Sequence, residues 1–180
     1  PLNVKAVSMR WVVFVGSVDD AIVGAPGLYH WFEHIPFRGT KKFPGGQRDL
    51  FAKLNRMGGS LNAHTTDMTT VYEVIIPLRE WRHGLELITD LAAQPLLREE
   101  DVEKERKIIF QEIVGHTGTV DGYVHNKKLT ILADNHPFGH CVLGDEVTLN
   151  SMSAEMLASA YRLGYDRCRM ALVVCGGMSE

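Results

Sequence analysis

The residues of this sequence that could do chemistry are concentrated in the short stretch Gly27–His34. It contains His30 and His34, four positions apart, with Glu33 directly before the second histidine. Positions i and i+4 lie on the same face of a helix, so both imidazoles can bind one zinc ion through ring nitrogens. Glu33 lies on the flank of that face. It is close enough to act on a metal-bound water without being a ligand.

The third ligand of such a site is expected on the charged segment Glu99–Val114, which has the pattern of a helix. Catalytic zinc usually takes three protein ligands and a water. Glu105 and Glu112 are seven positions apart, which is two helical turns, so they share a face with several aliphatic side chains. Carboxylates there are costly to bury unless they are paired or bound to metal. We expect Glu112 as a ligand and Glu105 as a supporting partner; the alternative is that both are ordinary surface acids.

The elements that must position these residues are indicated by periodicity and by glycine and proline signals. We expect strands over Val12–Val15, Leu61–Thr65, Thr70–Ile76 and Arg169–Cys175, of which the middle two form a hairpin. The first expected helix carries His30 and stops near Pro36, and a helix over Glu99–Val114 is expected to be closed by Gly115. The other expected helices are Arg48–Met57, Trp81 to near Pro95, Tyr123–Leu132 and Ser153 to Leu163. Strands at both ends and in a middle hairpin predict an α+β fold with a mostly antiparallel sheet covered by helices.

Composition limits the classes of function. The 180 residues are 45% hydrophobic, which suits one globular domain. The net charge of −3 argues against nucleic acid or an anionic membrane as a partner, and no apolar run approaches the ~20 residues of a membrane span. Three cysteines without a Cys-x-x-Cys pair favour a reducing compartment. We therefore expect an intracellular protein, with the cytoplasm favoured, although a trimmed start at Pro1 would leave this open.

Several blocks, in order, resemble the N-terminal domain of the pitrilysin (M16) metallopeptidases, the inverzincin family of insulin-degrading enzyme and the mitochondrial processing peptidase. The His-x-x-Glu-His order is the inverzincin order. The blocks are Gly27–Thr40 for the zinc helix, Gly58–Ala63 with Thr65, Thr69 and Tyr72 for the hairpin, Glu105–Ile113 for the second zinc helix, His136-Pro137 with Leu143-Gly144 for a later loop, and Tyr165 with Met170–Gly176 for the closing strand.

The resemblance implies a site and an activity. His30, His34 and Glu112 would hold Zn²⁺, with Glu33 as general base and Glu105 as an accessory carboxylate near the site. Asn62 and Ala63 would lie on an edge strand whose backbone pairs with an extended peptide. The implied protein is a zinc-dependent endopeptidase of the processing-peptidase-like metallohydrolase fold, acting on extended or unfolded peptides.

The resemblance also implies a partner. Enzymes of this family carry at least two such domains around a cavity, and the partner domain usually supplies an Arg–Tyr pair. Residues 1–180 would then be a single N-terminal-type domain, incomplete without a C-terminal-type domain or second subunit. The sequence departs from the family pattern at Pro36, Tyr29 and Asp145, none of which is an expected ligand.

Two other functions remain open at this point. The chain could be a non-catalytic peptide-binding or structural subunit, or the isolated half of a two-part peptidase. It could also resemble S-ribosylhomocysteine lyase, which shares the histidine order but takes a cysteine as third ligand; the first cysteine after His34 is Cys141. His64 is expected beside the substrate strand. For the remaining histidines we expect surface or turn positions, namely His83, His116, His125, His136 and His140.

Overall fold

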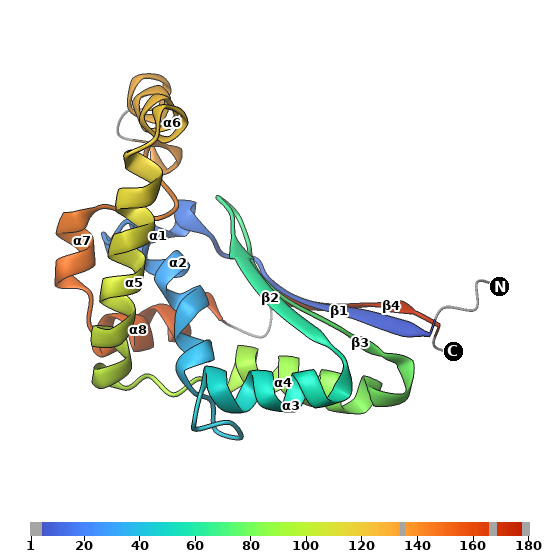
Figure 1. Cartoon of the computed structure of the whole chain (residues 1–180). Helices are drawn as coiled ribbons and strands as arrows, with labels where there is room; N and C mark the ends of the chain where they lie inside the picture. Colours follow the sequence, from blue (N-terminus) through green and yellow to red (C-terminus); the bar gives the residue numbers. More distant parts are fainter. Residues whose placement is uncertain (1–4, 134–135, 166–168, 178–180) are drawn as a thin grey trace.

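A computed structural model describes residues 5–133, 136–165 and 169–177 of the chain. Its centre is a four-stranded antiparallel sheet with the strand order β2–β3–β1–β4. The strands are β1 (Ala6–Val13), β2 (Ser60–Thr65), β3 (Thr70–Pro77) and β4 (Met170–Gly176). Figure 1 shows helices packed along one side of this sheet. The predicted α+β fold with an antiparallel sheet covered by helices is therefore confirmed.

The two faces of the sheet follow the alternation of the strand residues. Met9 on β1 lies opposite Val74 on β3, and both point into the core. The next pair along, Arg10 and Glu73, forms a 2.8 Å ion pair on the outer face. The expected strand over Val12–Val15 is wrong in extent, because β1 begins at Ala6 and ends at Val13. Polar residues interrupt the apolar run of β1, but they are confined to its solvent face.

Eight α-helices are found in the described ranges. They are α1 (Asp20–Val23), α2 (Leu28–His34), α3 (Gln47–Met57), α4 (Trp81–Ala93), α5 (Glu99–Thr117), α6 (Val120–Leu132), α7 (Glu146–Ser151) and α8 (Ala154–Gly164). Helix α4 packs against β1 and β3, and α2 contacts β2, β3, α5 and α8. This central position of α2 allows its side chains to meet those of α5 and β2.

One expectation about the helices is corrected, and one helix was not expected. Gly115 does not close α5, which continues to Thr117, because the αR backbone accommodates glycine within a helix at only a modest cost. Helix α7 was not expected, although Asp145 caps it by accepting a hydrogen bond from the Thr148 amide. The stop near Pro36 is confirmed: α2 ends at His34 and a 3₁₀ turn covers Ile35–Arg38. Within the described ranges, no helix combines the length and the apolar character needed to cross a membrane.

Candidate metal centre

Helix α2 holds its polar residues rigidly because it is buried on nearly every side. Leu28, Trp31 and Phe32 are 0–1% exposed, and the helix begins at Gly27, whose φ of 87° favours glycine. His30 and Glu33 are themselves buried, at 7% and 9% exposure. A helix that is apolar around most of its surface leaves little freedom for the few polar side chains it carries.

The packing of α2 against α5 brings His30, His34 and Glu112 together. The Nε2 atoms of His30 and His34 each lie 3.6 Å from the same carboxylate oxygen, Oε2 of Glu112. One ligand atom from each of the three residues lies within 4.8 Å of the others. Tetrahedral ligands at 2.0–2.1 Å from zinc are about 3.3 Å apart, so the observed spacing is close to that of a zinc site. The two imidazoles and the carboxylate also suit zinc in their chemistry.

The two histidines have different electrostatic surroundings. Burial, together with the charge of His34, lowers the pKa of His30 to about 3, so its imidazole is neutral. Burial also disfavours the charged form of His34, but its hydrogen bond with Glu105 and the charges of Glu112 and Glu33 raise its pKa above the ordinary value. A neutral imidazole is the form that binds metal, and the lowered pKa of His30 favours that form.

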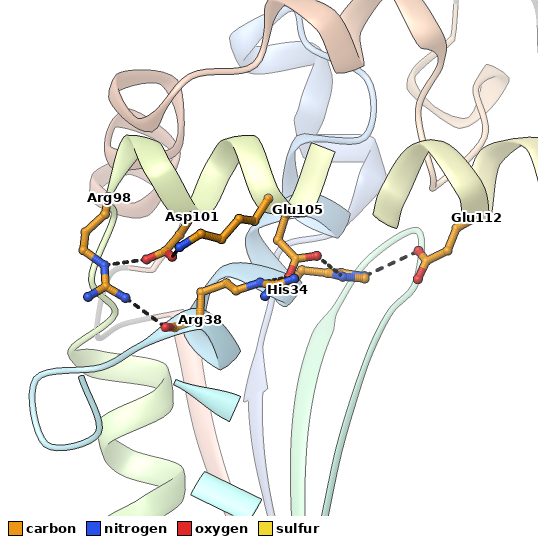
Figure 2. Close-up of polar contacts among 7 residues, drawn as sticks. His34, Arg38, Arg98, Asp101, Glu105 and Glu112 are labelled. Carbon is orange, nitrogen blue, oxygen red and sulfur yellow. Dashed lines mark hydrogen bonds and ion pairs between the residues drawn. The ribbon is translucent and has the colours of Figure 1, made fainter. Parts of the chain in front are cut away.

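Glu105 orients His34 from the side away from Glu112. Its Oε2 atom lies 3.3 Å from Nδ1 of His34, and its Oε1 accepts a hydrogen bond from Nε of Arg38. Figure 2 shows the His34 ring between the two carboxylates. Burial raises the pKa of Glu105, but the bonds with His34 and Arg38 outweigh this and hold it below its ordinary value. A carboxylate on the second ring nitrogen fixes the tautomer that leaves Nε2 free for metal.

This network extends beyond the predicted residues. Arg98 donates to the backbone carbonyl of Arg38 at 3.0 Å and also pairs with Asp101 (Figure 2). Arg38 was not predicted as part of the site, although its position four residues after His34 was a usable signal. Arg98 pairs across 60 positions, and no local pattern could have indicated it.

Glu33 faces the same region but is not one of the three clustered groups. Its Oε2 accepts a 2.7 Å hydrogen bond from Oγ1 of Thr65 on β2. Burial raises the pKa of Glu33, although the Thr65 bond and the charge of His34 oppose this. A carboxylate whose pKa is raised in this way is better matched to proton transfer near neutral pH. Thr65 lies on the inner face of β2, which it shares with Leu61 and Ala63. A polar residue in that apolar row is the sequence signal that could have indicated its role.

Two cavities meet at Glu33. One, of about 300 Å³, is lined by His34, Glu112, Asn62 and the apolar side chains Phe37, Phe51, Leu61 and Ile108, among others. The other, of about 370 Å³, is lined by His30, His64, Thr65, His116, His125 and the segment Cys141–Leu143. Glu33 and Ala63 line both. The two cavities therefore lie on either side of shared lining residues, Glu33 and Ala63.

Asn62 and Ala63 lie on β2, at an edge of the described sheet and next to the histidines. Asn62 is exposed and lines only the first cavity, whereas Ala63 is half-buried. His64 and His116 line the second cavity without joining the metal-capable group. The edge-strand position expected for Asn62 and Ala63 is thus observed, and their role in binding a peptide stays a prediction.

The expectation for His140 is wrong in one respect. Its Nε2 lies 3.3 Å from the buried carboxylate of Asp20, so it is a partnered side chain. Cys141 is half-buried and lines the cavity beside His30, but among the described residues the metal-capable group contains a glutamate and no cysteine. This argues against a lyase-type ligand set. Cys168 lies outside the described residues.

Comparisons with known proteins identify relatives of this chain among the peptidases. The family model described as insulinase (peptidase family M16) matches residues 3–143. The chain is 30% identical over 181 residues to coenzyme PQQ synthesis protein F of Pseudomonas syringae pv. tomato, covering 99% of this chain and 23% of that protein. It is 27% identical over 154 residues to the uncharacterized zinc protease YmxG of Bacillus subtilis, covering 86% of this chain and 37% of the relative.

A solved structure has the same fold. The putative M16-like peptidase from Alicyclobacillus acidocaldarius superposes with a TM-score of 0.85 at 25% identity, covering 98% of this chain and 42% of that one. The chain thus spans between about a quarter and two-fifths of the length of these proteins.

Proposed function

Because the chain belongs to the insulinase family of peptidases, family M16, we propose that it is the metal-binding half of a zinc-dependent endopeptidase that cleaves extended peptides. One observation carries the proposal: two imidazole Nε2 atoms from α2 and one carboxylate from α5 converge within coordinating distance of a common point. Beside them lies a buried carboxylate, Glu33, that is not needed as a ligand.

The proposed ligands of the metal are His30, His34 and Glu112, with Glu105 and Arg38 holding His34 in place. Zn²⁺, when bound, supplies a Lewis acid that polarises a carbonyl group and acidifies a water molecule. Two neutral imidazoles and one carboxylate leave the site a net positive charge with zinc, which suits this chemistry. The side chain of Glu112 is 41% exposed, so the site is open on the side of α5.

Glu33 is the proposed general base. It takes a proton from the attacking water and delivers it to the amine that leaves when the peptide bond breaks. The Thr65 hydroxyl holds one carboxylate oxygen at 2.7 Å and leaves the other for this transfer. The raised pKa of Glu33 supports both halves of the cycle, since the group must accept and then release the same proton.

The proposed substrate is a peptide in extended conformation lying along β2. An edge strand offers its backbone groups to a further strand, so main-chain hydrogen bonds supply the affinity. The peptide would run from the first cavity to the second, with the scissile bond at Glu33, which lines both. Because main-chain pairing does not depend on sequence, we expect loose side-chain selectivity.

We further propose that residues 1–180 form one domain and that a second domain or subunit of the same family completes the enzyme. The observation in favour is that the matched relatives are more than twice as long as the region this chain covers. The companion half would close the open side of the site at Glu112. For the chain alone we expect zinc binding with slow hydrolysis or none.

The test compares Glu33→Gln with the wild-type chain and with Asp90→Asn, which changes a buried acid on α4 remote from the proposed ligands. Zinc content and the hydrolysis of a quenched fluorescent peptide are measured for each, alone and with a C-terminal-type half of a matched relative. We expect all three to bind zinc and only Glu33→Gln to lose the hydrolysis seen in the complete mixture. Wild-type protein that binds no zinc, or hydrolysis that survives Glu33→Gln, would contradict the proposal.

A further inference from the structure

The first turn of α2 depends on a carboxylate that comes from another element. Asp20, at the start of α1, is 0% exposed. Its Oδ2 accepts a 2.7 Å hydrogen bond from the Gly27 amide, and its Oδ1 accepts a 3.0 Å bond from the Tyr29 amide. The N-cap residue Gly27 has no side chain that could do this. Asp20 therefore caps, from seven positions upstream, the helix that carries His30 and His34.

The same carboxylate also reaches the segment that follows α6. Nε2 of His140 lies 3.3 Å from Oδ2 of Asp20. Burial raises the pKa of Asp20, and the bonds with His140 and the two amides oppose this. The pKa of His140 is raised by its bond to Asp20. A buried carboxylate is costly unless bonded, so these partners explain how Asp20 is tolerated in the core.

Two further contacts fasten this segment to the start of α2. The backbone at Leu143 and Gly144 passes so close to Gly27 that a Cβ on Gly27 would lie 2.7 Å from the Leu143 carbonyl oxygen. Oγ1 of Thr148 donates a 2.8 Å hydrogen bond to the carbonyl of Pro26. Residues 140–148 thus meet the start of α2, or the Asp20 carboxylate that caps it, at three points, of which only the Asp20–His140 contact links side chains.

The joined segment also forms part of the site. Cys141, Val142 and Leu143 line the cavity of about 370 Å³ together with His30 and Glu33 of α2. A displacement of residues 140–148 relative to α2 would therefore change the distance between this cavity wall and the metal-binding face. Asp20 is buried and bonds to both segments.

We propose that Asp20 and His140 are positioning residues: Asp20 fixes the metal-binding helix, and His140 fixes the adjoining cavity wall to that helix. The assignment of α2 as the metal-binding helix rests on the proposed function, whereas the mechanical link between the two segments does not. The two residues have separable effects, because Asp20 bonds to the α2 amides and to His140, whereas His140 bonds to Asp20 and to the Ser17 backbone.

The experiment uses Asp20→Asn, His140→Gln and the control Asp90→Asn. The control is matched because Asp90 is also buried and accepts hydrogen bonds from a side chain, Thr40, and an amide, that of Lys42. Three quantities are measured: hydrogen exchange of the α2 amides in metal-free protein, the affinity for Co²⁺ from its visible absorption, and the alkylation rate of Cys141 by peptide mapping.

For Asp20→Asn we expect faster exchange in α2, Co²⁺ binding weakened by about 10- to 100-fold, as for other groups that orient ligands, and faster alkylation of Cys141. For His140→Gln we expect faster alkylation of Cys141 with α2 exchange and Co²⁺ affinity close to wild type. For Asp90→Asn we expect lower thermal stability with none of the three local changes. This pattern separates a positioning role from a general loss of stability.

The proposal is overturned if Asp20→Asn matches Asp90→Asn in α2 exchange, or if His140→Gln leaves the alkylation of Cys141 unchanged. If Asp20→Asn does not fold, the His140→Gln result still decides. Wild-type protein that binds no Co²⁺ would count against the proposed metal site, while the exchange and alkylation measurements would still decide whether the two segments are linked through Asp20.

Discussion

Two buried polar clusters of this molecule differ in how completely their polar atoms are paired by hydrogen bonds. On α4, Asp90 is 4% exposed and accepts hydrogen bonds from the Thr40 hydroxyl and the Lys42 amide, and Thr40 in turn accepts from the Phe43 amide. At the α2–α5 junction, Glu33 has a single side-chain hydrogen-bond partner among the described residues, the hydroxyl of Thr65. We call the first, Asp90 with Thr40, the closed cluster. The second, which comprises Glu33, His30, His34, Glu105 and Glu112, keeps unpaired polar atoms, and we call it the open cluster.

The histidines make this difference plainer. Nδ1 of His30 is buried and has no partner among the described residues. The Nε2 atoms of both histidines face Glu112 at 3.6 Å, beyond normal hydrogen-bond distance. Unsatisfied polar groups are rare in the interior of a protein and call for an explanation. The comparison separates a cluster whose polar atoms are paired within the fold from one that keeps unpaired polar atoms, as the proposed metal site requires.

The largest expected effect comes from removing one ligand of the open cluster. We expect His30→Ala to weaken zinc binding by more than about 100-fold, measured by competition with a chromogenic chelator, because two ligands do not make a stable catalytic site. We expect Asp90→Asn to retain wild-type zinc affinity and to lose about 1–3 kcal/mol of unfolding free energy, because it leaves a buried hydrogen-bond partner unsatisfied. Equal zinc affinity in His30→Ala and Asp90→Asn would contradict the assignment of metal binding to the open cluster.

The next largest effect is expected on peptide hydrolysis, from replacing the proposed general base Glu33. In the complete enzyme we expect Glu33→Gln to lower peptide hydrolysis by about 100-fold or more, with zinc content unchanged, because a general base contributes on that order. Thr65→Val should lower hydrolysis by less, since it removes only the bond that orients Glu33. A larger loss in Thr65→Val than in Glu33→Gln would reverse the two roles.

A smaller effect is expected at Glu105, which belongs to the open cluster but holds a ligand and not the metal. We expect Glu105→Gln to weaken zinc binding by about 10- to 100-fold, because carboxylates behind metal-binding histidines contribute on that order. Isothermal titration of zinc into the metal-free protein measures this. Glu103→Gln on the same helix, where the exposed acid pairs with Arg106, is the control and should have no effect. Glu105→Gln indistinguishable from it would exclude Glu105 from the site.

The smallest effect is a dependence of stability on pH. His140 faces Asp20 on α1 and Asp67 in the turn between β2 and β3, and its pKa is raised in the folded protein. Its contribution to stability is therefore present in full below its ordinary pKa of about 6.5 and is lost as the pH rises through the raised value. We expect urea unfolding to show a larger loss of stability between about pH 6 and about pH 9 in the wild type than in His140→Gln. Equal losses would contradict this.

The sequence indicated the open cluster in part. Spacing alone brought His30, Glu33 and His34 to one short helix, and glycine and proline signals placed the ends of that helix correctly. Glu112 required a second argument, from the buried face of α5 and from the family resemblance. The sheet could be predicted because each strand has an alternating face, although the outward-facing Ser8 and Arg10 concealed the start of β1.

The supporting contacts could not be predicted, for a physical reason. The Thr65–Glu33, Glu105–Arg38 and His140–Asp20 contacts join residues 32, 67 and 120 positions apart. Such pairs depend on how helices pack against the sheet, and periodicity within one element says nothing about them. Patterns along the chain therefore identify ligand candidates, while the groups that orient those ligands become visible only in three dimensions.

The most direct test of the account is zinc K-edge X-ray absorption of the zinc-loaded protein. We predict a first shell of nitrogen and oxygen at about 2.0–2.1 Å, with the outer-shell signal of two imidazoles and a change in the shell when Glu112 is replaced by glutamine. A sulfur neighbour at about 2.3 Å, as Cys141 would give, or a spectrum that Glu112→Gln leaves unaltered, would contradict a centre formed by His30, His34 and Glu112.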